Sequence, residues 1–192
     1  MKEYANNKLN NFIAGWYIDP ALCNKIVEKG ESDTSKFISW TPWYQHIDLK
    51  EFDKDMCDAY VKCLHATIEK YKEKYPLCYE ELQPWGWTPP RLQRYNPGQY
   101  YNVSHCENNG TASTIYRHFA YMTYVNDVKD GGGTKFINQD LITPAETGLT
   151  IIWPAQWTHY HRGVQAPSEV KYIITGWLCF QHGPPMDVYK TS

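Results

Sequence analysis

Two short stretches of this 192-residue sequence contain residue types that bind metal ions. The first is His105-Cys106-Glu107, and the second, much later in the chain, contains His159 and His161. Residues two apart on an extended strand point to the same face, so the side chains of His105 and Glu107 would lie together, with Cys106 opposite. Two imidazoles and one carboxylate form the facial triad of non-haem ferrous iron, which leaves coordination positions open for oxygen. The spacing therefore predicts an iron site, with either His159 or His161 as its third ligand.

Two helices are predicted before these stretches. Asp19-Pro20 is typical of a helix start, because an N-cap residue is followed by Pro at the first helical position. This helix would end at about Lys29, before Gly30. A second helix is predicted over residues 51–75, where apolar residues recur at intervals of three and four and mark one buried face. Pro76 would end it.

After Pro84 the sequence changes to short runs that are typical of strands, separated by Gly- and Pro-rich turns. The predicted strands are 91–95, 99–104, 119–126, 134–138, 149–153 and 171–180. This order predicts an α+β fold that is mainly β, a double-stranded β-helix (jelly roll) supported by N-terminal helices. We expect one domain over residues 1–192, with helical support and aromatic loops to about residue 88 and the jelly-roll core over about 89–183.

Composition excludes several classes of protein. The chain has 42% hydrophobic residues, 21% charged residues and a net charge of -2, so it lacks the charge that nucleic acids or membrane surfaces attract. No segment is typical of a membrane span or a signal peptide. We expect a soluble cytoplasmic protein, and no feature indicates its oligomeric state. The six cysteines follow neither a disulfide framework nor a zinc-site pattern, so we expect mostly reduced thiols.

Residues 92–178 resemble the prolyl 4-hydroxylase-like branch of the Fe(II)/2-oxoglutarate-dependent dioxygenases. The matching positions follow in the same order as in that family, and they are Tyr95-Asn96-Pro97-Gly98, His105-Cys106-Glu107, Arg117, Tyr124-Val125-Asn126-Asp127, Gly132-Gly133-Thr134-Lys135-Phe136, Pro144, Gly148, Trp153, His161, Lys171-Tyr172 and Thr175-Gly176-Trp177. In that family the distal ligand precedes the co-substrate lysine by ten positions, which selects His161 over His159 when Lys171 is that lysine. Glu107 departs from the pattern, because most members have Asp there.

The resemblance implies a role for each matching side chain. The residues implied to bind Fe(2+) and act in catalysis are His105, Glu107 and His161. Those implied to contact 2-oxoglutarate are Lys171, Tyr124, Tyr95 and Met122, with Lys171 binding the far carboxylate. Burying a lysine without a partner costs free energy, so an anionic ligand would explain a buried lysine at position 171. Arg117 would contact the substrate peptide or a neighbouring carboxylate, and His159 would be structural.

The reaction implied is hydroxylation of an unactivated C–H bond, most commonly on a prolyl residue of a peptide or protein. Fe(2+), 2-oxoglutarate and O2 would be required, succinate and CO2 would be released, and ascorbate would be an additional cofactor. The retained carboxylate at Glu107 favours hydroxylation over halogenation. Two aromatic stretches, residues 40–44 and 84–90, would either grip an extended peptide, chiefly through Trp85 and Trp87, or cover the sheet.

Three alternatives stay open from the sequence. The substrate would be a free small molecule in the first. In the second, the chain would be a jelly-roll module that binds peptide or carbohydrate without catalysis. This alternative does not explain the presence of the histidines, Glu107 and Lys171. In the third, it would be a cupin-type metalloenzyme that does not use 2-oxoglutarate.

Overall fold

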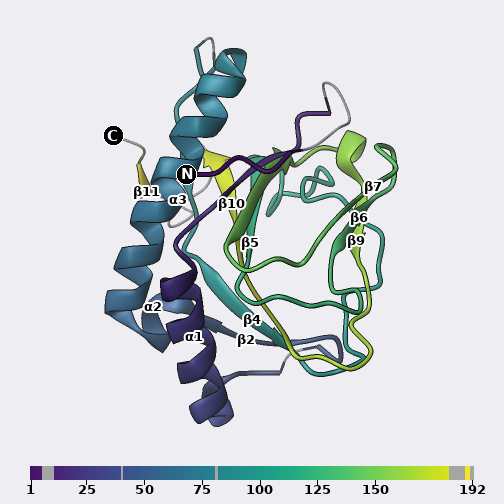
Figure 1. Ribbon diagram of the computed structural model, residues 1–192. Helices are drawn as coiled ribbons and strands as arrows, with labels where there is room; N and C mark the ends of the chain where they lie inside the picture. The colour runs from purple at the N-terminus through teal and green to yellow at the C-terminus, as the bar shows by residue number, and fades with distance from the viewer. Residues whose placement is uncertain (6–10, 40, 81, 182–188, 191–192) are drawn as a thin grey trace.

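Helices cover one face of a large antiparallel sheet, and a small sheet lies on the opposite side (Figure 1). The computed structural model describes residues 1–5, 11–39, 41–80, 82–181 and 189–190. The elements in chain order are β1 (Ala14–Tyr17), α1 (Pro20–Ser32), the 3-10 helix η1 (Thr34–Lys36), β2 (Gln45–Asp48), α2 (Leu49–Phe52), α3 (Lys54–Lys74), the 3-10 helix η2 (Pro76–Cys78), β3 (Trp85–Trp87), β4 (Arg91–Tyr95), β5 (Arg117–Tyr124), β6 (Thr134–Phe136), β7 (Leu141–Thr143), β8 (Leu149–Pro154), the 3-10 helix η3 (Trp157–His159), β9 (His161–Gly163), β10 (Lys171–Phe180) and β11 (Tyr189–Lys190).

The large sheet is organised around β10. Its strands follow the order β1-β8-β5-β10-β3-β11, and β4 pairs with β10 on one side and with β2 on the other. The small sheet has the order β7-β6-β9, and the pairings within both sheets are antiparallel. The predicted fold, a jelly roll supported by N-terminal helices, is confirmed.

Alternation along β10 gives the large sheet two different faces. Tyr172, Ile174 and Leu178 belong to the core that the sheet shares with the helices. Their neighbours, Lys171, Ile173, Thr175 and Trp177, line a cavity on the other face. Because successive side chains of a strand point to opposite faces, one strand contributes both to the core and to the cavity wall.

The first helix begins as predicted and ends later than predicted. The side chain of Asp19 accepts a hydrogen bond from the Ala21 amide at 2.9 Å, and Pro20 occupies the first turn. The helix continues through Gly30 to Ser32, so the predicted end at Lys29 is wrong. A Cβ atom on Gly30 would lie 2.7 Å from the Tyr172 hydroxyl oxygen, so Gly30 lets the helix lie close against β10 instead of ending it.

The predicted helix over residues 51–75 is two helices. Residues 49–52 form α2, and α3 begins after Asp53, whose side chain accepts a hydrogen bond from the Met56 amide at 2.9 Å. Asp53 has an extended backbone (φ -164, ψ 114), which breaks the helix and caps the next one. The buried stripe along α3 is Cys57, Tyr60, Leu64, Thr67, Ile68 and Tyr71.

Most predicted strands are present, and one is not. Strands β4 and β10 have the predicted bounds, and β5, β6 and β8 differ from prediction at their ends. Residues 99–104 form an irregular segment, because their contact with β9 is the Gly163 amide donating to the Tyr101 carbonyl and no ladder forms. Strands β1, β2 and β3 come from the part that was expected to be helical support, and all three join the large sheet.

The described residues contain no disulfide, and all six cysteines are free, as expected. Among the helices that the structure describes, none combines the length and the apolarity that a membrane span requires.

Truncating the buried face of α3 tests the helix-sheet core. Ile68 is fully buried there, so we expect Ile68→Ala to lower the free energy of unfolding by about 2–5 kcal/mol. Lys62 lies on the exposed face of the same helix, and Lys62→Ala should change the free energy of unfolding by less than about 0.5 kcal/mol. Urea unfolding followed by circular dichroism measures both values, and equal values for the two variants would contradict this packing.

Candidate active site

A cavity of about 740 Å³ lies against the inner face of the large sheet. Its wall includes alternate residues of β4 and β10, the segment that contains His105 and Glu107, and His161 of β9. Its volume is within the range of about 300–1,000 Å³ that small-molecule sites have. The candidate metal ligands and Lys171 therefore line one cavity.

A pair of backbone hydrogen bonds joins the two histidine stretches. The His105 amide donates to the His161 carbonyl at 3.0 Å, and the His161 amide donates to the His105 carbonyl at 2.9 Å. This bridge is isolated, so the prediction that His105 and Glu107 lie on a regular strand is wrong. Their side chains nevertheless converge: ligand atoms of His105, Glu107 and His161 all lie within 4.8 Å of one another.

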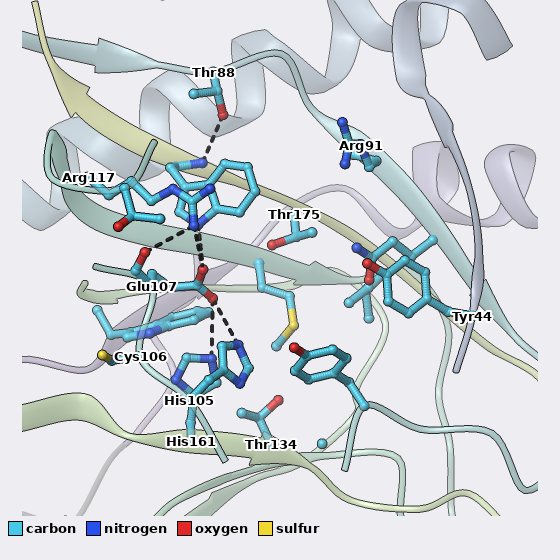
Figure 2. A pocket seen from close by; sticks show the side chains of 18 of the residues that line it. Tyr44, Thr88, Arg91, His105, Cys106, Glu107, Arg117, Thr134, His161 and Thr175 are labelled. Carbon is cyan, nitrogen blue, oxygen red and sulfur yellow. Dashed lines mark hydrogen bonds and ion pairs between the residues drawn. The ribbon is translucent and has the colours of Figure 1, made fainter. Parts of the chain in front are cut away.

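Both imidazoles are oriented by main-chain carbonyls. His105 Nδ1 lies 2.9 Å from the Val103 carbonyl oxygen, and His161 Nδ1 lies 2.9 Å from the His159 carbonyl oxygen. Because a carbonyl only accepts, each Nδ1 carries a proton, so Nε2 is the nitrogen of each ring that is left for a ligand in the cavity. Each Nε2 lies 3.4 Å from Glu107 Oε1, so the three potential ligand atoms face one another (Figure 2).

The carboxylate of Glu107 is held in its ionised form. Burial opposes its ionisation, but its contacts with the imidazoles of His105 and His161 outweigh burial and hold the pKa of Glu107 well below its ordinary value. The same contact holds the pKa of His105 above its ordinary value, although burial alone would lower it. A largely covered carboxylate that faces two imidazole nitrogens fits a divalent cation with N and O ligands, such as ferrous iron.

The other oxygen of Glu107 has protein partners. The Trp177 indole N–H donates to Oε2 at 2.6 Å, and Arg117 Nη1 lies 3.5 Å from the same oxygen. Arg117 also donates to the Glu107 backbone carbonyl at 3.0 Å, and its guanidinium lies 3.6 Å from the centre of the Trp177 ring (Figure 2). Of the two contacts predicted for Arg117, the structure shows the neighbouring carboxylate.

Lys171 is a buried cation without an acidic partner among the residues that the structure describes. Its side chain is 4% exposed, its ammonium donates to the Gly132 carbonyl at 3.1 Å, and it lies 4.4 Å from the centre of the Tyr95 ring. Burial lowers the pKa of Lys171 to about 8. A buried ammonium with this surplus of charge fits an anionic ligand in the cavity.

The other residues predicted to contact 2-oxoglutarate lie at different depths. Tyr95 and Met122 line the cavity, and the Tyr95 hydroxyl donates to Gln93 at 2.7 Å. Tyr124 lies behind the wall, where its hydroxyl lies 2.8 Å from the hydroxyl oxygens of Thr134 and Thr143. Thr134 lines the cavity, so Tyr124 would act on a ligand through Thr134. The direct contact implied for Tyr124 does not fit this placement.

His159 is already engaged by the protein. Its Nε2 lies 2.8 Å from the Asn11 carbonyl oxygen and its Nδ1 lies 2.9 Å from the Thr158 hydroxyl oxygen. Both ring nitrogens therefore have partners away from Glu107. This placement agrees with the structural role implied for His159.

The tryptophans predicted to bind substrate are in the core. Trp85 is fully buried and Trp87 is 7% exposed, and both pack between the sheet and the helices instead of lining the cavity. A substrate in this cavity would not contact them, so that assignment is corrected. Trp40 lies outside the described residues, whereas Tyr44 from the same aromatic stretch lines the cavity (Figure 2).

Sequence reasoning assigned no role to Trp177, Thr134 or Tyr44. Trp177 was part of the resemblance, and the alternation along β10 from Lys171 would have placed it on the cavity face. Thr134 also belongs to the resemblance and Tyr44 to the aromatic stretch over residues 40–44, but their places in the cavity depend on which segments pack beside β10.

Comparison with known proteins agrees with this geometry. The sequence profile described as the 2OG-Fe(II) oxygenase superfamily matches residues 90–179, and no curated protein matches the chain. The structure of a viral collagen prolyl hydroxylase from Paramecium bursaria Chlorella virus-1, as a 2OG complex, is similar with a TM-score of 0.67 and 14% identity, over 91% of this chain and 98% of that chain.

Two further solved structures have the same architecture. A Pseudomonas putida prolyl-4-hydroxylase has a TM-score of 0.64 and 14% identity, over 90% of this chain and 94% of that chain. A Trichoplax adhaerens prolyl hydroxylase, in complex with a hypoxia inducible factor peptide fragment, has a TM-score of 0.67 and 14% identity, over 90% of this chain and 85% of that chain. Residues 90–179 thus match the 2OG-Fe(II) oxygenase superfamily, and the chain has the fold of the prolyl 4-hydroxylases.

Proposed function

We propose that this dioxygenase hydroxylates an unactivated C–H bond of a peptidyl prolyl residue and releases succinate and CO2. The observation that carries the proposal is the sharing of one cavity by the cluster of His105, Glu107 and His161 and by Lys171, which has no acidic partner among the described residues. A metal cluster alone would fit many enzymes, and a buried lysine alone would fit many anions. Together they fit a metal ion and a dicarboxylate bound side by side.

The proposed metal ligands are Nε2 of His105, Nε2 of His161 and Oε1 of Glu107. Ferrous iron bound there would supply the activation of oxygen and leave positions open for the co-substrate. The Nδ1 contacts hold both rings, and the Phe136 and Trp153 rings pack 5.5 and 5.1 Å from the His161 ring. These contacts orient the ligands before metal binds.

The proposed site for the far carboxylate of 2-oxoglutarate is the ammonium of Lys171. Tyr95 and Met122 would form the wall beside it, and Thr134, held by the Tyr124 hydroxyl, would offer a hydroxyl to the same region. Ascorbate remains a prediction, and the structure contains no feature that indicates a site for it among the described residues.

A peptide is the proposed class of substrate. One structural neighbour is described as a complex with a peptide fragment, and another as a collagen prolyl hydroxylase. In this chain Tyr44, Tyr101 and Arg91 add aromatic and cationic surface to the cavity, with Arg91 exposed to solvent. The match of residues 90–179 to the oxygenase superfamily disfavours a binding module without catalysis, and a free small molecule is the second candidate substrate.

The two histidines of the distal stretch make a matched pair of variants. His161→Ala should weaken Mn(II) or Co(II) binding by more than the roughly 10–100-fold that loss of an outer partner costs, because it removes a direct ligand. His159→Ala removes a buried imidazole two residues away and should lower stability while metal affinity changes far less. Titration calorimetry measures the affinities, and a larger loss for His159→Ala would reject the ligand assignment.

Lys171 gives the affinity for 2-oxoglutarate a pH dependence. The charged ammonium is the form that binds a carboxylate, and its pKa without co-substrate is about 8. Affinity should therefore be full below pH 8 and fall by about tenfold per pH unit above it, since one proton is then taken up on binding. Calorimetry with the Mn(II)-loaded protein measures this slope.

Lys171→Met supplies the control for that slope. It should bind 2-oxoglutarate more weakly at pH 7 and show no comparable fall between pH 8 and pH 9. The same fall in both proteins would show that a group other than Lys171 titrates, and unchanged affinity in the variant would refute the lysine assignment alone.

Turnover tests the proposed reaction. With ferrous iron, ascorbate and a panel of proline-containing peptides, the protein should form succinate from 2-oxoglutarate, and mass spectrometry should find one added oxygen on a prolyl residue. His161→Ala is the control and should form neither product. Hydroxylation of free amino acids but of no peptide would favour the small-molecule alternative, and absence of succinate with every substrate would contradict the proposed function.

A further inference from the structure

We propose that Trp177 positions Glu107 for metal binding: its indole N–H holds Oε2, so that Oε1 alone is presented to the metal. This inference rests on the proposed metal centre and goes beyond it, because it assigns a residue that acts through a ligand. It also gives a physical account of how this chain uses Glu where most similar proteins have Asp.

A glutamate ligand creates a geometric problem that an aspartate ligand does not. Its extra methylene adds a rotatable bond, so the carboxylate has more orientations to lose when it is fixed. A free carboxylate can also turn both oxygens to one metal and occupy a position that a facial triad must leave open. A glutamate in this place therefore needs a second anchor.

Trp177 supplies that anchor with a strong and directional hydrogen bond. Its indole nitrogen lies 2.6 Å from Oε2, while Oε1 lies 3.4 Å from both imidazole Nε2 atoms (Figure 2). Hydrogen bonds to an ionised acceptor are shorter and stronger than neutral ones. The two oxygens of Glu107 thus have separate partners, the indole for one and the imidazoles for the other.

Trp177 is itself held through its backbone and through its ring. The Trp177 amide donates to the Thr88 hydroxyl at 2.9 Å, and the residue pairs with Ala120 in the centre of the sheet. The Arg117 guanidinium lies over the ring at 3.6 Å and donates to the Glu107 carbonyl at 3.0 Å. Arg117 therefore links the indole to the backbone of the residue that the indole orients.

The test is a double-mutant cycle on metal affinity, measured as Co(II) binding without 2-oxoglutarate. Trp177→Phe keeps an aromatic ring and removes the N–H, and it should weaken Co(II) binding by about 10-fold or more, as loss of an outer partner does. Glu107→Asp should cause a loss of similar size, because the shorter side chain withdraws its oxygen from the indole. When Trp177→Phe is added to Glu107→Asp, Co(II) affinity should fall by less than about 3-fold further, since the contact between the indole and the carboxylate is already lost.

A matched control separates this effect from general destabilisation. The Trp85 indole also donates a hydrogen bond, to the Cys78 carbonyl at 3.1 Å, but it lies in the helix-sheet core. Trp85→Phe should lower thermal stability and leave Co(II) affinity within about 2-fold. If Trp177→Phe does not fold, Arg117→Met tests the same link, and its loss of affinity should likewise shrink in the Glu107→Asp background.

The outcomes decide the proposal separately from the proposed function. The positioning role would be overturned, with the metal centre intact, if Trp177→Phe lowered Co(II) affinity equally in the wild-type and Glu107→Asp proteins. It would also be overturned if Trp177→Phe left the Co(II) affinity of the wild-type protein unchanged. Wild-type protein that binds no Co(II), or binds it unchanged after His161→Ala, would instead overturn the metal centre on which the inference rests.

Discussion

Two backbone hydrogen bonds between His105 and His161 hold the candidate active site together. They connect an irregular segment to β9 at the edge of the small sheet, beside the hydrogen bond from the Gly163 amide to the Tyr101 carbonyl. Each histidine also uses Nδ1 to contact a carbonyl beside its own position, Val103 for one and His159 for the other. The backbone thus sets both the distance between the imidazoles and the nitrogen that each presents to the cavity.

The cavity contains a negative charge at Glu107 and a positive charge at Lys171, and each suits a ligand of the opposite charge. The largely covered carboxylate of Glu107 faces two imidazole Nε2 atoms, and the buried ammonium of Lys171 faces a carbonyl and a tyrosine ring. Burying a charge is costly, so Lys171 favours an anionic ligand, and a cation at Oε1 of Glu107 would add to the compensation that Arg117 gives at Oε2. A cation beside Glu107 and a carboxylate beside Lys171 would relieve both costs, which is the physical basis of the proposed co-substrate geometry.

Local chemistry in the sequence was enough to predict part of this structure. Asp19-Pro20 predicted the start of α1, and strand-like runs between turn residues predicted β4 and β10. The family resemblance, through its ten-residue offset from Lys171, selected the histidine that faces Glu107. Other features depend on packing between distant segments. Gly30 continues a helix because Tyr172 leaves no room for a Cβ atom, and Trp85 and Trp87 are covered by helices that lie far from them in sequence. The hydrogen bond between Trp177 and Glu107 depends in the same way on β10 lying beside the metal segment.

The most direct test of this account is a crystal structure of the protein with Mn(II) and 2-oxoglutarate, with the metal located by its anomalous scattering. We expect one strong anomalous peak between His105, Glu107 and His161, with Oε1 of Glu107 toward the metal and Oε2 still on Trp177. The co-substrate should reach from that peak to Lys171. A metal bound elsewhere, or a co-substrate whose far carboxylate lies away from Lys171, would contradict the account.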